Sequence, residues 1–315
     1  MDVYCVGQIV VDVLIKPVNS VNFDVDTKKV DNICLRTGGD CSNAAIALSK
    51  LGNKVGITMR IGKDCFGDFV LWEMKKNGID ITGLKISEEA STSVCVVLIN
   101  KEGKRTFLYY GGANELLEYE DVIIPFIEKT KIVHVGGTFL LPNFDGEGAA
   151  KLFKIAQEKK KLTSMDVTWD TAGKWLETIK PCLKYLDFFM PSYEEAKKIT
   201  GRNDPGDMAS FLQDEGVKTV VIKLGKNGCY VKGPKEESFY LPAYDVKAID
   251  TTGAGDSFVA GFLTGVIKNW GLRKCADFAS AVSAYCIQNI GATSGIPGFN
   301  DVVKLMKKHE NLIIE

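Results

Sequence analysis

The sequence predicts an α/β fold built around a mostly parallel sheet. Short runs rich in β-branched and aromatic residues alternate along the 315 residues with longer segments of helical periodicity. The short runs are apolar almost throughout, as strands are when helices cover both faces of a parallel sheet. No linker rich in Pro, Gly and Ser divides the chain. One compact body with excursions is therefore expected rather than two separate units.

The expected core elements follow in order. Strands are expected within six apolar runs: VYCVGQIVVDV (3–13), KVGITMRIG (54–62), KIVHVGG (131–137), LTSMDVT (162–168), YLDFFMP (185–191) and TVVIKLG (219–225). Helices are expected over residues 42–51, 68–77, 146–161, 192–200 and 207–215, from about 255 onward, and over 273–288. The helix that begins near 255 repeats Phe or Val every four residues, which marks a face directed at the core.

Two segments break this alternation. Residues 15–36 show weak periodicity and no clear helix, whereas residues 92–110 are typical of a hairpin whose turn is made by Gly103. These strands form either a small sheet that projects from the body or an ordinary edge of the main sheet, and the residues alone leave both open. A further hairpin is expected in GCYVKGPKEESFYLPAY, residues 228–244.

Composition excludes several classes of function. The formal net charge is −1, from 39 basic and 40 acidic residues, so a nucleic-acid partner is not expected. Nine cysteines without a C-x-x-C pair indicate reduced thiols and a cytoplasmic location. No apolar run approaches the roughly 20 residues of a membrane span. Of the two histidines, His134 lies in a buried-strand pattern and His309 in a charged tail, which disfavours histidine-dependent nucleophilic catalysis.

The stretch DTTGAGDSFVAGF, residues 250–262, places bare backbone where an apolar helix begins. The amides of Gly253, Ala254 and Gly255 would be among the unpaired donors at the helix start, where the helix dipole attracts anions such as phosphate. Asp256 would lie in the first turn as a carboxylate at neutral pH, placed to take a proton from a hydroxyl that attacks phosphorus. An ordinary turn followed by a first-turn acid is the alternative. The chain has no G-x-x-x-x-G-K-[ST] motif, which excludes a P-loop nucleoside triphosphatase.

The whole stretch resembles the C-terminal signature of the ribokinase-like (PfkB) family of carbohydrate kinases. GGDCSNAAIALSKLG (38–52) resembles the first signature of that family, RIGKDCFGDFVLWEMKKNGID (60–80) continues it, and KLGKNGCYV (223–231) resembles its nucleotide strand and turn. The resemblance covers essentially the full length with the motifs in order. It implies a single three-layer, Rossmann-like kinase domain over residues 1–315, with lid strands inserted at about 13–36 and 92–112.

The resemblance also implies roles for individual residues. Asp256 would be the catalytic base, and Gly253, Ala254 and Gly255 would form the anion hole for the transferred phosphoryl group. Sugar binding would fall to Asp12, Gly38, Gly39, Asp40, Asn43 and Arg105. Taken singly, Asn43 is also typical of a helix start, Asp12 of a turn at a strand end, and Arg105 of an exposed hairpin. Asp40 stands where ribokinases commonly have lysine, which argues against ribose and against a strongly anionic sugar phosphate.

The cofactor sites are implied in the same way. ATP would contact Lys223, Gly225, Gly228 and Ser280, although Ser280 alone would suit an apolar helix face. Magnesium would be held through water by Glu195 in PSYEEA, where Ser192 replaces the usual asparagine; Glu195 alone would suit a first-turn acid. A monovalent cation such as K⁺ would be held by Asp250 and Thr252 with carbonyls around Asn289 and Gly291.

The expected activity is ATP-dependent phosphorylation of a hydroxyl, preferably primary, on a small sugar or sugar acid. A nucleoside kinase on the same scaffold is the alternative within the enzymes, and a non-catalytic sugar- or nucleotide-binding regulator is the alternative outside them. A homodimer paired through lid strands is also expected. The residues do not name the sugar.

Overall fold

The computed structural model describes residues 1–235 and 237–313. Among these residues, an 8-stranded main sheet has the order β14-β13-β12-β11-β10-β9-β1-β4. The strands from β12 to β4 are parallel, and β13 and β14 are antiparallel at one edge. The predicted, mostly parallel sheet is therefore confirmed. Its strands are β1 (Val3–Gly7), β4 (Val55–Thr58), β9 (Ile132–Thr138), β10 (Leu162–Val167), β11 (Phe188–Phe189), β12 (Thr219–Lys223), β13 (Cys229–Lys232) and β14 (Ser238–Leu241).

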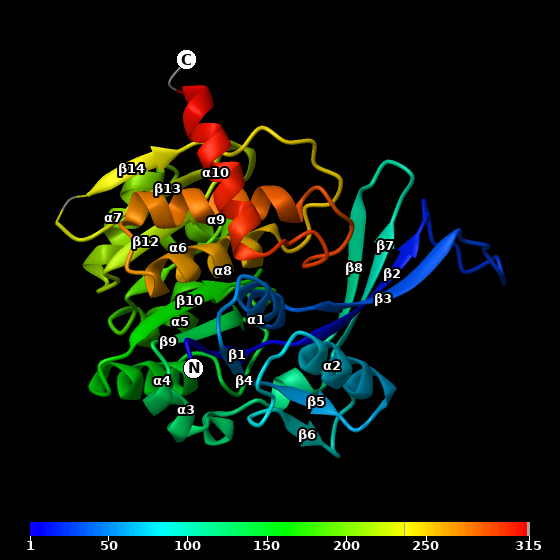
Figure 1. Ribbon diagram of the computed structural model, residues 1–315. Helices are drawn as coiled ribbons and strands as arrows, with labels where there is room; N and C mark the ends of the chain where they lie inside the picture. Colours follow the sequence, from blue (N-terminus) through cyan, green and yellow to red (C-terminus); the bar gives the residue numbers. More distant parts are fainter. Residues whose placement is uncertain (236, 314–315) are drawn as a thin grey trace.

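Helices cover both faces of this sheet and make a three-layer molecule (Figure 1). Along β1, Val3 and Cys5 pack in one hydrophobic cluster while Tyr4 and Val6 pack in the other, as the period of two in a strand requires. No helix in the described part of the chain is long and apolar enough to cross a membrane.

Each hydrophobic cluster draws on the helices of one face of the main sheet. The cluster with Val3 and Cys5 includes residues of α1 (Asp40–Lys50), α2 (Cys65–Lys76), α8 (Ala254–Ile267), α9 (Leu272–Cys286) and α10 (Phe299–Ile313). The cluster with Tyr4 and Val6 includes residues of α3 (Ile124–Lys129), α4 (Glu147–Glu158), α5 (Leu176–Leu183), α6 (Tyr193–Thr200) and α7 (Pro205–Asp214).

A second sheet of four strands projects from one side of the body (Figure 1). Its order is β3-β2-β7-β8, from β2 (Val10–Lys16), β3 (Asn32–Gly38), β7 (Val94–Ile99) and β8 (Arg105–Tyr110). The pair β2–β7 is parallel, and the two outer pairs are antiparallel. Of the two arrangements that the residues left open, the projecting small sheet is the one observed. A short parallel pair, β5 (Arg60–Gly62) and β6 (Lys85–Ser87), lies beside it.

One expected strand is in fact two. The run 3–13 divides into β1 in the main sheet and β2 in the small sheet, with Gln8 and Ile9 between them. At Gly7, which has φ 148°, a Cβ would overlap the carbonyl oxygen of Gly136, so only glycine allows the chain to leave the main sheet here. Both halves are apolar because each is buried in its own sheet, and no change of pattern marks the break.

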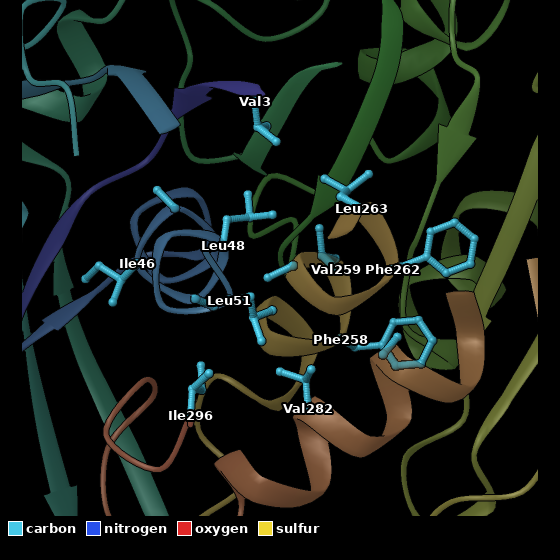
Figure 2. Packing of buried hydrophobic residues seen from close by; sticks show 14 of the residues in the cluster. Val3, Ile46, Leu48, Leu51, Phe258, Val259, Phe262, Leu263, Val282 and Ile296 are labelled. Carbon is cyan, nitrogen blue, oxygen red and sulfur yellow. The ribbon is translucent and has the colours of Figure 1, made fainter. Parts of the chain in front are cut away.

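The packing of α1 against α8 fixes the relative position of their first turns. Figure 2 shows Leu48 of α1 and Leu51, which follows that helix, directed toward Val259 of α8, with Phe258 and Val282 nearby. These side chains are at most 6% exposed. Close packing of this kind allows little relative movement, so the residues that begin the two helices are held in a fixed relationship.

Candidate active site

The polar residues expected from the sequence gather at one edge of the main sheet. The parallel strands β1, β9, β10 and β12 end at this edge, and α1 and α8 begin there, beneath the small sheet. In open α/β sheets, ligands bind outside the carboxyl ends of the strands. The topology therefore locates the candidate site at this edge of the main sheet, on the side of the small sheet.

The start of α8 leaves backbone donors at this edge of the main sheet. Gly253 caps the helix in the left-handed conformation with φ 73°, and a Cβ there would lie 2.5 Å from Ala292. The amide of Ala254 donates to the carbonyl of Thr251 at 3.3 Å. A helix leaves its first amides without intrahelical acceptors, so the amides of Gly255 and Asp256 remain to bind an anion. Gly253, Ala254 and Gly255 stand at this helix start, and their role as an anion hole stays a prediction.

Asp256 retains part of its exposure and accepts a 2.8 Å hydrogen bond from the side-chain amide of Asn43. Burial, with the nearby charge of Asp166, raises the pKa of Asp256 to about 7, although Asn43 and Lys223 act in the opposite direction. The sequence argument from the helix dipole predicted a carboxylate at neutral pH, and it did not include the desolvation that raises this pKa. A pKa near 7 suits a general base at neutral pH.

A buried ion pair lies beside the start of α8. The Nζ of Lys223, at the end of β12, is 2.7 Å and 2.8 Å from the two carboxylate oxygens of Asp166, at the end of β10. A Cβ on Gly255 would lie 3.2 Å from the same Nζ. Burial alone would lower the pKa of Lys223, but the charges of Asp166 and Glu195 raise it, so the side chain is an ammonium. Lys223, expected to contact ATP, thus has its side chain beside the helix start.

Sequence reasoning missed Asp166. It is 2% exposed and is the only charged residue in its strand. A charged residue at the carboxyl end of a buried parallel strand is a signal that was available, because this is where α/β proteins place functional groups. The run LTSMDVT was used only to predict a strand.

Two acidic residues and two glycines lie where the small sheet meets the start of α1. A Cβ on Gly38 would overlap the carboxylate of Asp12, so glycine is required at that point. Burial, with the charges of Asp256 and Asp250, raises the pKa of Asp12 to about 7. Burial and the charge of Asp256 also raise the pKa of Asp40, in the first turn of α1, and Gly39 caps that helix with φ 91°. Asp12 and Asp40 are thus both electrostatically linked to Asp256.

The inner face of the small sheet is more polar than the sequence suggested. The register aligns Arg36, Asp12, Cys95 and Tyr109 in one cross-strand row. The side-chain amide of Gln8, which follows β1, donates to the hydroxyl of Tyr109 at 3.2 Å. Neither Gln8 nor Tyr109 was singled out, because each lies in a run that is otherwise typical of a buried or hairpin strand. The hydrogen bond between Gln8 and Tyr109 therefore joins the small sheet to the main body.

A cavity of about 440 Å³ runs from Lys223 and Gly255 between β12 and helices α8 and α9. It is lined in part by Tyr244, Val246 and Phe258, and its far end includes Ser280. The hydroxyl of Ser283 donates to the carbonyl of Ala254 at 2.8 Å. Three of the expected nucleotide positions, Gly225, Gly228 and Ser280, line this cavity together with Lys223. A second hollow of about 630 Å³ shares Lys223, Gly225 and Lys226 with it and extends to Ser192.

Glu195 lies near the ion pair, and its carboxylate caps the helix to which it belongs. It forms a capping box at the start of α6, in which Oε2 accepts from the amide of Ser192 at 2.7 Å. Burial raises the pKa of Glu195, although the charge of Lys223 acts against this. Within the described residues, no group of three or more His, Cys, Asp or Glu side chains could hold a metal ion. Glu195 lies close enough to Lys223 and Asp166 to interact with both charges, and its role toward magnesium stays a prediction.

The residues expected to hold a monovalent cation lie close together. An arginine side chain already contacts the carboxylate among them. Asp250 Oδ1 accepts from the amide and hydroxyl of Thr252 at 3.0 Å and 2.7 Å, and Oδ2 accepts from the amide of Gly291 at 2.9 Å. Arg105, expected to contact substrate, donates to Oδ1 at 2.9 Å. Asn289 is exposed in the same loop as Gly291, and its side chain contacts the carbonyl of Tyr285.

The structure defines a three-layer α/β protein whose candidate site lies at the start of α8. Comparisons with known proteins give its class. A model of the pfkB family of carbohydrate kinases matches residues 1–298. An ATP-dependent 6-phosphofructokinase of Thermoanaerobacterium thermosaccharolyticum is 30% identical over 97% of this chain and 93% of its own length. A probable fructokinase-5 of Arabidopsis thaliana is 32% identical over 86% of this chain and 88% of its own.

Among solved structures, a putative ribokinase II of E. coli in complex with ATP and Mg²⁺ superposes with a TM-score of 0.84 at 21% identity. The match covers 98% of this chain and 99% of the other, and it shows the shared fold. The chain belongs to the pfkB family of carbohydrate kinases. The resemblance of its two signatures to that family is therefore confirmed.

Proposed function

We propose that this carbohydrate kinase transfers the γ-phosphoryl group of ATP to a hydroxyl, preferably primary, of a small sugar or sugar acid, with Asp256 as the base. The observation that carries the proposal is the position of Asp256. Its pKa is about 7, and it lies in the first turn of α8 between Asn43 and the Lys223–Asp166 pair. A base of this pKa beside free amides is suited to deprotonating an attacking alcohol.

The chain's own groups divide the work of the transfer. Asp256 accepts the hydroxyl proton while the sugar oxygen bonds to the γ-phosphorus and the bond from that phosphorus to the bridging oxygen of ADP breaks. The amides at the start of α8, from Gly253 to Asp256, stabilise the charge on the transferred group. The ammonium of Lys223, held against Gly255, adds positive charge on the same side. Asp12, Gly38, Gly39, Asp40 and Asn43 would orient the sugar, with Gln8 and Tyr109 above it.

The nucleotide is assigned to the cavity between β12 and helices α8 and α9. Its apolar lining at Tyr244, Val246 and Phe258 suits an adenine ring, and its other end at Lys223 and Gly255 suits phosphates. Gly225, Gly228 and Ser280 are the further contacts proposed. Mg²⁺ would neutralise the phosphate charge during transfer. Because Mg²⁺ in such sites is bound mostly by phosphates and water, Glu195 alone fits as its outer contact.

The test is release of ADP by the purified protein across fructose, fructose 6-phosphate, an aldonate, a 2-keto-3-deoxy sugar acid, ribose and adenosine. Turnover of a sugar or sugar acid supports the proposal. Turnover of adenosine alone favours the nucleoside kinase. Tight binding of one compound without turnover, measured by calorimetry, favours the regulator. We expect fructose 6-phosphate to be a poorer substrate than fructose, because Asp12 and Asp40 supply carboxyl groups that suit sugar hydroxyls and offer no positive charge to a second phosphate.

We also propose a homodimer formed through the small sheet. By register, its outer face carries Ile33 and Leu35 of β3 and Leu108 and Tyr110 of β8, with Val13 and Val96 between them. The four outer-strand side chains are 38–58% exposed. A continuous apolar sheet face of this kind is typical of a protein interface, and a second copy presents the same apolar face. Light scattering should give a dimer for the natural sequence and a monomer for Leu108→Glu; a natural monomer contradicts the proposal.

Three expectations stay predictions. The nine cysteines are all unpaired thiols, as a cytoplasmic protein would have them, but the location itself is untested. The organisation as one kinase unit over residues 1–315, with its lid in the small sheet, is likewise proposed. A monovalent cation at Asp250 is kept as the competing alternative to an arginine at the same carboxylate, and the next experiment separates the two.

A further inference from the structure

Arg105 joins the small sheet to the loop that leads into α8. It begins β8, the edge strand of the small sheet, and its guanidinium contacts three consecutive residues of that loop. Nη1 donates to the carboxylate of Asp250 at 2.9 Å and to the hydroxyl of Thr252, and Nη2 donates to the hydroxyl of Thr251 at 2.9 Å. One side chain of the small sheet therefore holds the segment immediately before Gly253.

Asp250 is a charge that needs a counter-charge. Its side chain is only 12% exposed, and its two oxygens also accept hydrogen bonds from Thr252 and Gly291. Burial alone would raise the pKa of Asp250, but those hydrogen bonds and the charge of Arg105 hold it below the ordinary value. A carboxylate removed from water is stable when it is paired with a positive group. The only such group that contacts it in the described part of the chain is Arg105.

The loop that Arg105 contacts sets the geometry of the helix start. Thr252 directly precedes Gly253, the residue that caps α8, and the carbonyl of Thr251 accepts from the amide of Ala254. Any movement of residues 250–252 is therefore passed to the amides of Gly255 and Asp256. Because Arg105 belongs to the small sheet, its contact links the position of that sheet to this loop.

We propose that Arg105 is the built-in cation of the loop 250–252 and a positioning residue that couples closure of the small sheet to assembly of the phosphoryl-binding amides. This inference rests on the proposed function for the reaction that it serves. The guanidinium takes the place that a monovalent cation would fill at Asp250. Closing the lid over a sugar would complete the amide site, so ATP would be hydrolysed slowly when no sugar is bound.

The first test needs no turnover. Thermal unfolding of the natural protein, Arg105→Ala and Lys104→Ala is measured in KCl and in choline chloride at equal ionic strength. Lys104 is the matched control, because it is the neighbouring cation of the same hairpin and its side chain is 80% exposed. We expect the unfolding temperature of Arg105→Ala to be higher in KCl than in choline chloride. The unfolding temperatures of the other two proteins should be the same in both salts. A natural protein stabilised specifically by K⁺, or an Arg105→Ala variant as indifferent as the natural one, overturns the inference.

The second test uses the sugar that the substrate screen identifies. We expect Arg105→Ala to lower kcat about tenfold to a hundredfold, the size of a lost charged hydrogen bond, with little change in KM for the sugar. Millimolar guanidinium or K⁺ should restore part of kcat, Arg105→Lys should retain part of it, and the ratio of sugar-independent to sugar-dependent ADP release should rise. A raised sugar KM with unchanged kcat would instead make Arg105 a substrate contact and overturn the inference. If no compound in the screen turns over, the proposed function fails while the salt comparison still decides the role of Arg105.

Discussion

Asn43 and Asp256 are 213 residues apart in sequence, yet the Nδ2 of Asn43 donates a 2.8 Å hydrogen bond to Oδ2 of Asp256. The two residues come from the beginnings of α1 and α8, so two helix N-termini meet at one carboxyl group. The other amide atom of Asn43, Oδ1, is buried without a hydrogen-bond partner in the described part of the chain. Its acceptor capacity is therefore unused close to Asp256, although the atom is closed off from solvent.

Asn43→Ala should lower activity in a pH-dependent way. The hydrogen bond from Asn43 lowers the pKa of Asp256, so its loss raises that pKa above about 7 and leaves less base at neutral pH. The acid limb of kcat/KM should move to higher pH, and activity should recover in part as the pH rises. Asn53→Ala is the matched control, since Asn53 donates from just beyond α1 to Thr264 of α8. A uniform loss at every pH would contradict this account of Asn43.

The natural enzyme should lose activity as the pH falls through about 7. A base acts when deprotonated, so a pKa of about 7 at Asp256 predicts that kcat/KM falls about tenfold per pH unit below that value. The check is a pH–rate profile at constant ionic strength and saturating Mg²⁺. An acid limb near pH 4, the range of an unperturbed carboxyl, would contradict the environment described for Asp256.

Lys223→Met should lower both the unfolding free energy and kcat, each for a different reason. Breaking a buried ion pair costs about 3–5 kcal/mol because a charge is left unpaired, and Asp166 is that charge. The double variant Lys223→Met/Asp166→Asn should regain most of the unfolding free energy without regaining kcat, because the positive charge beside Gly255 is still missing. Lys218→Met is the matched control; Lys218 pairs with Asp187 just before the same strand and is 60% exposed. Recovery of kcat in the double variant would show that Lys223 acts on stability alone.

Alanine at the two glycines before Asp256 should separate folding from function. At Gly253 a Cβ meets Ala292 at 2.5 Å and the backbone has φ 73°, so Gly253→Ala should lose more than about 1 kcal/mol of unfolding free energy. At Gly255 the contact is 3.2 Å to the end of a lysine side chain. Gly255→Ala should thus unfold near the natural temperature but bind ATP and turn over poorly. Thermal unfolding and initial rates check both; equal behaviour of the two variants would contradict the proposed anion site.

The parts of the fold that follow from local pattern were predicted from the sequence. The strands β9, β10 and β12 and the helices that begin near Asp40 and Ala254 lie within a few residues of the expected ranges. The division of residues 3–13 into two sheets was missed because tertiary placement, rather than local pattern, causes it. The helix α10 was also missed, since its segment lay beyond the last recognised motif and was interpreted as a charged tail.

The candidate site was predicted in its residues more than in its electrostatics. Asp256 and Asn43 could be named from their motifs, but their contact depends on how α1 packs against α8. Burial sets the pKa of Asp256, and burial cannot be read from a first-turn position. The partner of Lys223, Asp166, and the partner of Arg105, Asp250, come from elements far away in sequence. Pairwise contacts of this kind are absent from any single-sequence pattern.

The central claim is that Asp256 removes the proton from the acceptor hydroxyl. Its most direct test is the steady-state comparison of Asp256→Asn with the natural enzyme on the identified sugar. The account predicts that kcat falls about 10²–10⁴-fold, the usual contribution of a general base, that KM for the sugar and ATP stays within a few-fold, and that the acid limb near pH 7 disappears. A variant that retains natural kcat, or that keeps the same acid limb, would contradict the claim.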